Sequence, residues 1–275
     1  MWVFNSIFGK IFEIIFFPFR NMSPWIGMIL ISFLTALLML FVFRFTSNQQ
    51  GIKKVKNKIK AHLLEFRLYK DSLNISLKAQ GKILRYNLKY ISYSAKPVLV
   101  MIIPLILILI QLNLWFGYNS LTPGQKALLK AELEMDQSLL DTEFKIETSS
   151  GLVVETLPLR IEDKEEVSWR LRAEETGIHE LALTVNGQKI IKKVAVAQSP
   201  LSKISPIRIR RNFIGELFNP GEAPLPGNIP VKSLEIKYLS QSMNLFGWHI
   251  HWIIVYFALS IIFGFAFKGI FKIEI

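Results

Sequence analysis

The chain contains no cysteine, which excludes disulfide bonds, thiolate metal sites and cysteine nucleophiles. Acidic residues are also few: 21 aspartates and glutamates stand against 33 lysines and arginines, giving a formal net charge of +12. We find no catalytic or metal-binding motif, and we therefore expect no enzyme activity, no metal and no cofactor. Apolar residues are abundant, at 51% of 275 positions, which indicates that the membrane is the main solvent.

Three uncharged apolar stretches are long enough to cross a bilayer as helices, which takes roughly 20 residues each. These predicted spans are residues 24–43, 97–117 and 248–267. Four tryptophans lie at the span ends that share one side, where we expect an aromatic belt: Trp25, Trp115, Trp248 and Trp252.

The basic residues are concentrated in one segment. Residues 44–96 contain thirteen lysines and arginines but only Glu65 and Asp71 as acids, so they carry +11 of the net charge. Because basic residues beside spans are retained in the cytoplasm, this segment is predicted to be cytoplasmic. The N-terminus and residues 118–247 then lie outside, and the tail at 268–275, with Lys268 and Lys272, returns to the cytoplasm. We expect an integral, multi-pass protein of a bacterial inner membrane.

The first 20 residues have a different pattern. Asn5, Ser6, Lys10 and Glu13 share one helical face, and apolar residues cover the rest. This arrangement predicts, for residues 1–20, an amphipathic helix that lies in the outer membrane interface. A cleavable signal peptide is the alternative, although the basic start and the small-residue cleavage site that it needs are not evident.

Within the basic segment, apolar residues recur at helical spacing on both sides of the sequence YKDSLN, which predicts a hairpin of two helices. One apolar stripe contains Ile52, Val55, Ile59, Leu63 and Phe66, and the other contains Leu77, Leu84, Leu88 and Ile91. The bases either only fix the topology and rest against anionic headgroups, or also bind a polyanion such as ribosomal RNA. The predicted basic recruitment surface consists of Arg44, Lys53, Lys54, Lys56, Lys58, Lys60, Arg67 and Lys70.

Residues 118–198 change to short alternating runs, which are typical of strands. Turn residues occur at 149–151 and at Asn186-Gly187, the latter a strong hairpin signal. About six or seven short strands in this length predict a small immunoglobulin-like β-sandwich outside the membrane. Residues 199–247, rich in proline and glycine, are expected to form a loosely packed linker, although 231–239 alternates well enough to be a further strand.

Each predicted span carries a stripe of small, polar or flexible residues at helical spacing. Such stripes either allow close helix packing or line a partly hydrated groove, in which methionines adapt to varied apolar guests. The candidate residues of a substrate groove are Ser32, Thr35, Met39, Met101, Gln111, Asn113, Tyr256 and Ser260.

The first span leaves the membrane as TALLMLFVFRFTSNQQGIKKVKNKIKAHL, the second follows YSAKP, and the last runs as GWHIHWIIVYFALSIIFGFAFKGIF into a short basic tail. In these stretches and in the order of its parts, the chain resembles the insertase superfamily of YidC, the mitochondrial oxidase-assembly insertase and the insertase subunit of the endoplasmic-reticulum membrane protein complex. It is most similar to the transmembrane and coiled-coil domain protein of that membrane, over residues 24–117 and 245–275.

This resemblance implies a three-helix core, a cytoplasmic helical hairpin that receives substrates or ribosomes, and a hydrophilic groove that eases the passage of polar segments. The chain departs from the family in two respects. Some members place an arginine in mid-span, whereas Arg44 lies at the edge of the first span, and a whole β domain separates the last two core helices.

We therefore expect an α-helical membrane protein with a three-helix insertase-like core, a basic cytoplasmic hairpin and an inserted β-sandwich. Its expected function is that of a membrane-protein insertase or insertion chaperone without covalent chemistry. The expected partners are membrane lipids, nascent membrane proteins, and a ribosome or translocon. The alternative is a membrane-anchored structural or adaptor subunit whose β-sandwich binds an extracytoplasmic protein.

Overall fold

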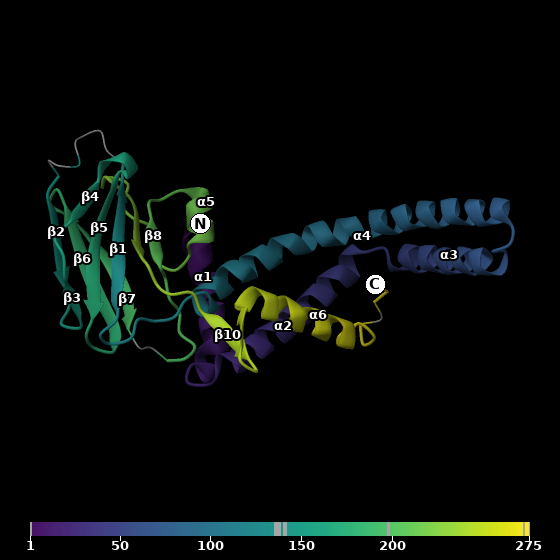
Figure 1. Cartoon of the computed structure of the whole chain (residues 1–275), viewed down its shortest axis with the longest axis horizontal. Coiled ribbons are helices and arrows are strands. Elements are labelled where there is room, and N and C mark those ends of the chain that lie inside the picture. The colour runs from purple at the N-terminus through teal and green to yellow at the C-terminus, as the bar shows by residue number, and fades with distance from the viewer. Residues whose placement is uncertain (1, 135–138, 140–141, 197–198, 272, 275) are drawn as a thin grey trace. The chain divides into compact units, whose positions relative to one another are not determined.

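The computed structural model describes residues 2–134, 139, 142–196, 199–271 and 273–274, and the chain divides into two compact units (Figure 1). Residues 28–107 and 253–275 form one of them, which we call the helical unit. Residues 1–27 and 108–252 form the other, which we call the sandwich unit because it contains all the strands. Lys272, assigned above to the tail, lies outside the described residues.

Two helices are long and apolar enough to cross a membrane: α2, Pro24–Thr46, and α4, Leu73–Phe116. A third apolar helix, α6, Trp252–Phe267, is shorter, at 16 residues. The predicted second span is the C-terminal part of α4, which is continuous through Pro97 and Pro104. Proline in a helix removes one backbone hydrogen bond, which apolar helices tolerate where neighbouring groups satisfy the freed carbonyl.

The predicted hairpin of two helices is confirmed. Helix α3, Gln49–Leu68, lies beside the first half of α4 (Figure 1). The rings of His62 and Tyr86 stack at 5.5 Å between centroids, and Lys82 lies 3.6 Å from Glu65. Asn48 begins α3 by accepting a hydrogen bond from the backbone of Gly51, as an N-cap residue does.

The two predicted apolar stripes of the hairpin have different environments. In α3, Ile52 and Val55 are buried. The stripe on α4, in contrast, is 59–64% exposed at Leu77, Leu84, Leu88 and Ile91. Ala79 is fully buried instead, so the leucines of this stripe lie on the outer face of α4.

Two of the three antiparallel sheets described in the sandwich unit turn their apolar faces to one core. The larger sheet follows the order β3 (Leu152–Val154), β5 (Glu166–Ala173), β1 (Lys126–Leu133), β9 (Val231–Ile236) and β8 (Ile207–Ile209), with β4 (Leu159–Ile161) also paired to β5. The smaller sheet consists of β2 (Phe144–Thr148), β6 (Gly177–Val185) and β7 (Gln188–Val196). In β5, Trp169 and Leu171 are buried and Arg170 is exposed, as the alternation predicts.

Two local predictions in this unit are confirmed. Asn186 and Gly187 join β6 to β7 with φ angles of 48° and 78°, the left-handed pair that a two-residue hairpin turn requires. Residues 231–236 form β9, which pairs with both β1 and β8. Of the predicted β domain, residues 135–138, 140, 141, 197 and 198 lie outside the described residues.

The prediction of a loose linker at 199–247 was wrong. Leu201, Ile204, Leu225 and Ile229 are each at most 3% exposed, and the segment contains β8, β9 and the short helix α5, Phe213–Phe218. Its prolines and glycines make turns between buried apolar anchors. A composition rich in turn residues therefore marks irregular backbone here, not weak packing.

The predicted span at 248–267 begins four residues too early. Strands β10, Ser242–Leu245, and β11, Trp248–His251, form a hairpin before α6 starts at Trp252. Phe246 and Gly247 make its turn with φ angles of 51° and 91°. Hydropathy alone does not distinguish an apolar strand from the first turn of an apolar helix.

Helix α1, Trp2–Phe16, followed by the 3₁₀-helix η1, Phe17–Phe19, directs its polar side into the sandwich unit. The buried Asn5 donates to the carbonyl of Glu216, and Glu13 accepts from Lys203 at 2.8 Å. The outward side keeps the exposed Lys10, but most of its residues are apolar and 46–74% exposed: Val3, Ile7, Ile11, Ile14 and Phe17. This distribution is the opposite of that on a surface helix in water.

The expected tryptophan belt is only partly compatible with the burial of these side chains. Trp115 and Trp252 are 1% and 2% exposed, so they pack inside the protein instead of facing its surroundings. Trp248 is 76% exposed, and Trp25 donates its indole N–H to the carbonyl of Asn244 at 3.1 Å. Trp25 and Trp248 thus remain as candidates for contact with lipid headgroups.

Candidate functional site

Three helices of the helical unit, α2, α4 and α6, surround a cavity of about 370 Å³. This volume falls within the range of roughly 300–1,000 Å³ that is usual for ligand pockets. Five predicted groove residues line it: Thr35, Met39, Met101, Tyr256 and Ser260. They reach the cavity because each lies on the side of its helix that faces the other two.

Most of the cavity wall consists of apolar residues that the sequence did not single out. The missed residues are Ala36, Leu40, Phe43, Val98, Ile102, Leu105, Phe257, Ile261 and Phe265, whereas Gly264, which also lines the cavity, belongs to the predicted stripe of the last span. These residues are of the same apolar types as the rest of the spans, so nothing in the sequence distinguishes them as cavity residues. The cavity is thus an apolar space with three hydroxyl groups on its wall.

Two of these hydroxyls are unusual because they are buried and unpaired. Among the described residues, neither Thr35 Oγ1 nor Tyr256 OH has a hydrogen-bond partner at standard geometry, although the Tyr256 hydroxyl lies within hydrogen-bonding reach of the Thr35 and Ser260 hydroxyls. A buried polar group without a partner costs about 1–3 kcal/mol. Neither oxygen has appreciable accessible surface, so a guest molecule or water in the cavity reaches neither of them and meets an almost wholly apolar wall.

Ser32 supports the cavity without lining it. Its hydroxyl donates to the carbonyl of Tyr256 at 3.5 Å, and Ser260 Oγ donates to the carbonyl of Ser32 at the same distance. These contacts join α2 to α6. Ser32 therefore agrees with the helix-packing interpretation of the polar stripes, in which small hydroxylated residues let helices pack closely.

Gln111 and Asn113, also predicted for the groove, are not among the residues that line this cavity. Leu105 is the last α4 residue on its wall, and a helical rise of about 1.5 Å per residue puts Gln111 roughly 9 Å beyond it. Both residues belong to the sandwich unit. There Gln111 is 2% exposed beside Gly9 of α1 and Lys203, and Asn113 borders a small pocket with Tyr118.

The predicted basic surface is open to solvent. Of its eight residues only Lys56 is half-buried, and it donates to the carboxylate of Glu274 at 3.1 Å. The backbone N–H of Glu274 also donates to Gln49 Oε1 at 2.7 Å, which fastens the C-terminal segment to the base of the hairpin. The hydrogen bond from Lys56 lowers the pKa of Glu274, so the carboxylate stays charged and the contact persists at neutral pH.

The arrangement is suited to holding an apolar segment, and the described part of the chain has no group of three or more histidines and carboxylates able to hold a metal ion. His62 and Glu65 form a close pair at 2.6 Å on the hairpin, where the hydrogen bond from His62 lowers the pKa of Glu65. No family model, no curated protein and no solved structure matches this chain.

Proposed function

We propose that the chain is a membrane-protein insertase or insertion chaperone of the superfamily that it resembles, with α2, α4 and α6 spanning a bacterial inner membrane. The observation that carries this proposal is the continuity of α4. One helix begins in the basic hairpin and, 25 residues later at Val98, enters the wall of the cavity. A client captured by the hairpin can therefore follow α4 to the cavity.

The lengths and surfaces of the helices support a position in the membrane. Helix α1 exposes an apolar face, as a helix in the bilayer interface does. Helix α6, at 16 residues, is about 24 Å long, whereas the bilayer core is about 30 Å thick. A short span favours a locally thinned bilayer. Thinning would shorten the apolar path that a translocated polar stretch must cross.

The character of the cavity shapes the proposed mechanism. Its wall is almost wholly apolar, because the hydroxyls of Thr35 and Tyr256 are closed off from it, so it fits an apolar client segment. The flexible side chains of Met39 and Met101 adapt to varied guests. The mechanism is thus a transient shelter for a segment on its way into lipid, with no bond made or broken.

The hairpin supplies the recruitment surface on the cytoplasmic side. Its exposed bases attract anionic partners such as a ribosome, and the attraction weakens as salt rises. The outward stripe of Leu77, Leu84, Leu88 and Ile91 adds apolar contacts for a nascent membrane protein. A surface with both features fits clients that combine an apolar segment with an acidic flank.

Site-specific photo-crosslinking tests this proposal. A benzoylphenylalanine at Met101 of the cavity is expected to capture nascent membrane proteins during translation with inner-membrane vesicles. The matched control is Ile103, which lies on the same helix, is 66% exposed and does not line the cavity. Equal capture at Met101 and Ile103, or capture of lipid alone at both, would contradict the proposal.

The alternative is a membrane-anchored structural or adaptor subunit, in which an immunoglobulin-like sandwich binds an extracytoplasmic protein. Leu157 and Leu159, at 88% and 62% exposed beside the edge strand β4, support it as an apolar contact surface. Replacing both by serine separates the two functions. An adaptor would lose its partner, while an insertase would keep its capture of clients at Met101.

A further inference from the structure

The sandwich unit contains a second pocket, of about 330 Å³, whose wall is rich in charged and hydroxylated residues. Arg20, directly after η1, and Lys193, on β7, supply positive charge. The segment after β7 adds the hydroxyls of Ser199, Ser202 and Ser205. Residues far apart in the sequence therefore form one polar site, and nothing in the proposed insertase mechanism uses it.

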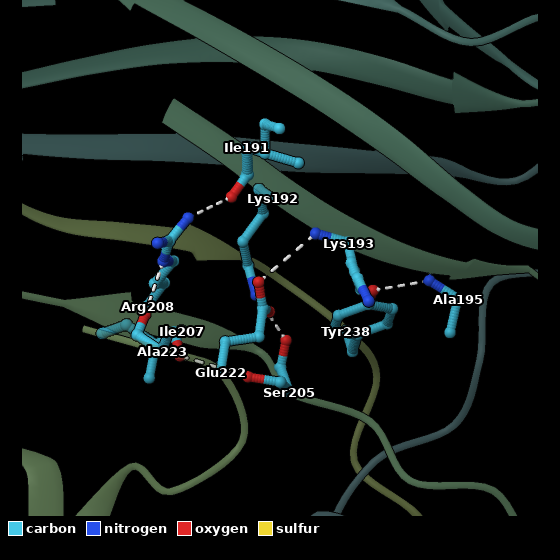
Figure 2. Close-up of polar contacts among 10 residues, drawn as sticks. All are labelled: Ile191, Lys192, Lys193, Ala195, Ser205, Ile207, Arg208, Glu222, Ala223 and Tyr238. Carbon is cyan, nitrogen blue, oxygen red and sulfur yellow. Dashed lines mark hydrogen bonds and ion pairs between the residues drawn. The ribbon is translucent and has the colours of Figure 1, made fainter. Parts of the chain in front are cut away.

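The two carboxylates of this pocket are already neutralised. Glu13 accepts from Lys203 at 2.8 Å, and Glu222 forms an ion pair with Lys192, whose side chain is fully buried (Figure 2). Among the described residues, neither Arg20 nor Lys193 forms an ion pair with an acid. The pocket thus has two cations available to a bound anion.

Lys192 and Glu222 also fix each other in place. Lys192 Nζ donates to the carbonyl of Ser205 at 2.7 Å as well as to Glu222, whose second oxygen accepts from the backbone of Lys193 at 3.4 Å (Figure 2). Burial lowers the pKa of Lys192, and the charge of Glu222 opposes that effect. Glu222 is consequently committed to internal partners and leaves the cations of the pocket unopposed.

Tyr238 and two serines provide neutral donors. The Tyr238 hydroxyl accepts a hydrogen bond from Ala195 at 3.0 Å, so its own proton is free to be donated (Figure 2). Burial raises the pKa of Tyr238, which keeps the hydroxyl protonated. Ser199 and Ser202 make no side-chain hydrogen bond to the described residues. Cations and hydroxyl donors in this combination match the oxygens of a phosphate group.

An apolar surface lies next to the cations. The Arg20 guanidinium is 5.4 Å from the ring centre of Phe17, which is 68% exposed, and the exposed apolar face of α1 leads up to it. We propose that this pocket binds the phosphate ester of a glycerophospholipid, with its acyl chains along α1. The proposal goes beyond the insertase function and shares with it only the location in a membrane.

Native mass spectrometry of the full chain in detergent, stripped of lipid, tests this site. Phosphatidylglycerol is expected to bind in preference to a diacylglycerol with the same chains, because only the former carries a phosphate. The double variant R20Q/K193Q should weaken binding of phosphatidylglycerol by roughly tenfold or more, since each substitution removes a charge-assisted contact. S202A, which removes one hydroxyl donor and no charge, should weaken it by roughly threefold.

The matched control is K189Q, which removes one charge from the same strand outside the pocket and should change the affinity by less than about twofold. Glycerol phosphate added as a competitor identifies the source of the phosphate. Displacement by millimolar competitor supports a site for soluble phosphate esters, and its failure supports a lipid site. Equal binding of diacylglycerol, or an unchanged affinity in R20Q/K193Q and S202A when both variants fold, would overturn the proposal.

Discussion

Polar atoms are buried both around Lys192 in the sandwich unit and around the cavity of the helical unit. The two places differ in whether these atoms have hydrogen-bond partners. Lys192 is fully buried and reaches both a carboxylate and a carbonyl. Thr35 and Tyr256 bury hydroxyls that meet no hydrogen-bond partner among the described residues. A paired buried group helps to hold the fold, whereas a buried group without a well-placed partner costs stability. Substitutions at the two places should therefore have opposite effects.

The largest effect is expected from Lys192→Met. The change leaves Glu222 charged and mostly buried without its partner, which should destabilise the sandwich by roughly 3 kcal/mol. Hydrogen exchange of the β6 and β7 amides in the full chain measures this loss within the sandwich itself. The double variant K192M/E222Q should recover part of it, because it removes the uncompensated charge. A double variant that is less stable than K192M would refute this account of the pair.

The second prediction asks whether filling the cavity with a larger side chain blocks the capture of clients. A Cβ added at Gly264, which lines the cavity, meets nothing within 4 Å, and the same holds at Gly269, which does not line it. Gly264→Leu should therefore fold normally yet reduce photo-capture of clients at Met101 by roughly tenfold, because the leucine occupies the space of a guest. Gly269→Leu is the matched control and should leave capture unchanged. Similar losses in both variants would show that the cavity is not the binding space.

Removal of the unpaired hydroxyls should stabilise the protein. Thr35→Val and Tyr256→Phe keep nearly the same shape and remove a buried group without a partner, for an expected gain of about 1 kcal/mol each. Thermal unfolding of the full chain in one detergent measures the gain. Ser32→Ala, which removes a bonded hydroxyl, is expected to lower stability instead. If all three variants are destabilised, the hydroxyls of Thr35 and Tyr256 have partners in the folded protein and the contrast with Lys192 fails.

Local features could be predicted from the sequence because short stretches determine them. The turn at Asn186 and Gly187, the break between α3 and α4, and the strand at 231–236 were all anticipated from spacing and turn residues. Five of the eight groove residues share one cavity because helical periodicity fixes which side chains share a face. Periodicity along one helix is therefore a dependable guide to the candidate site.

Features that depend on contacts between distant segments could not be predicted. Gln111 lies beside Gly9 of α1, a contact between segments about 100 positions apart that no local spacing indicates. The buried anchors of residues 199–247 looked like a linker because burial depends on the sheets that they meet. The pocket at Arg20 brings together residues more than 170 positions apart, such as Arg20 and Lys193, and no local sequence pattern predicts it.

The smallest predicted effect concerns an ordinary paired group. Lys130 on β1 donates to Glu166 on β5 at 2.6 Å, and this hydrogen bond is the main cause of the lowered pKa of Glu166. A carboxylate whose pKa is lower in the folded state stabilises the fold above its ordinary value, 4.5, and loses that contribution as the pH falls through the folded value. Lys130→Gln should therefore cost about 0.5 kcal/mol at neutral pH and almost nothing in strong acid. Unfolding of both proteins across this range measures the difference, and a gap that persists in acid would show that Lys130 acts through packing.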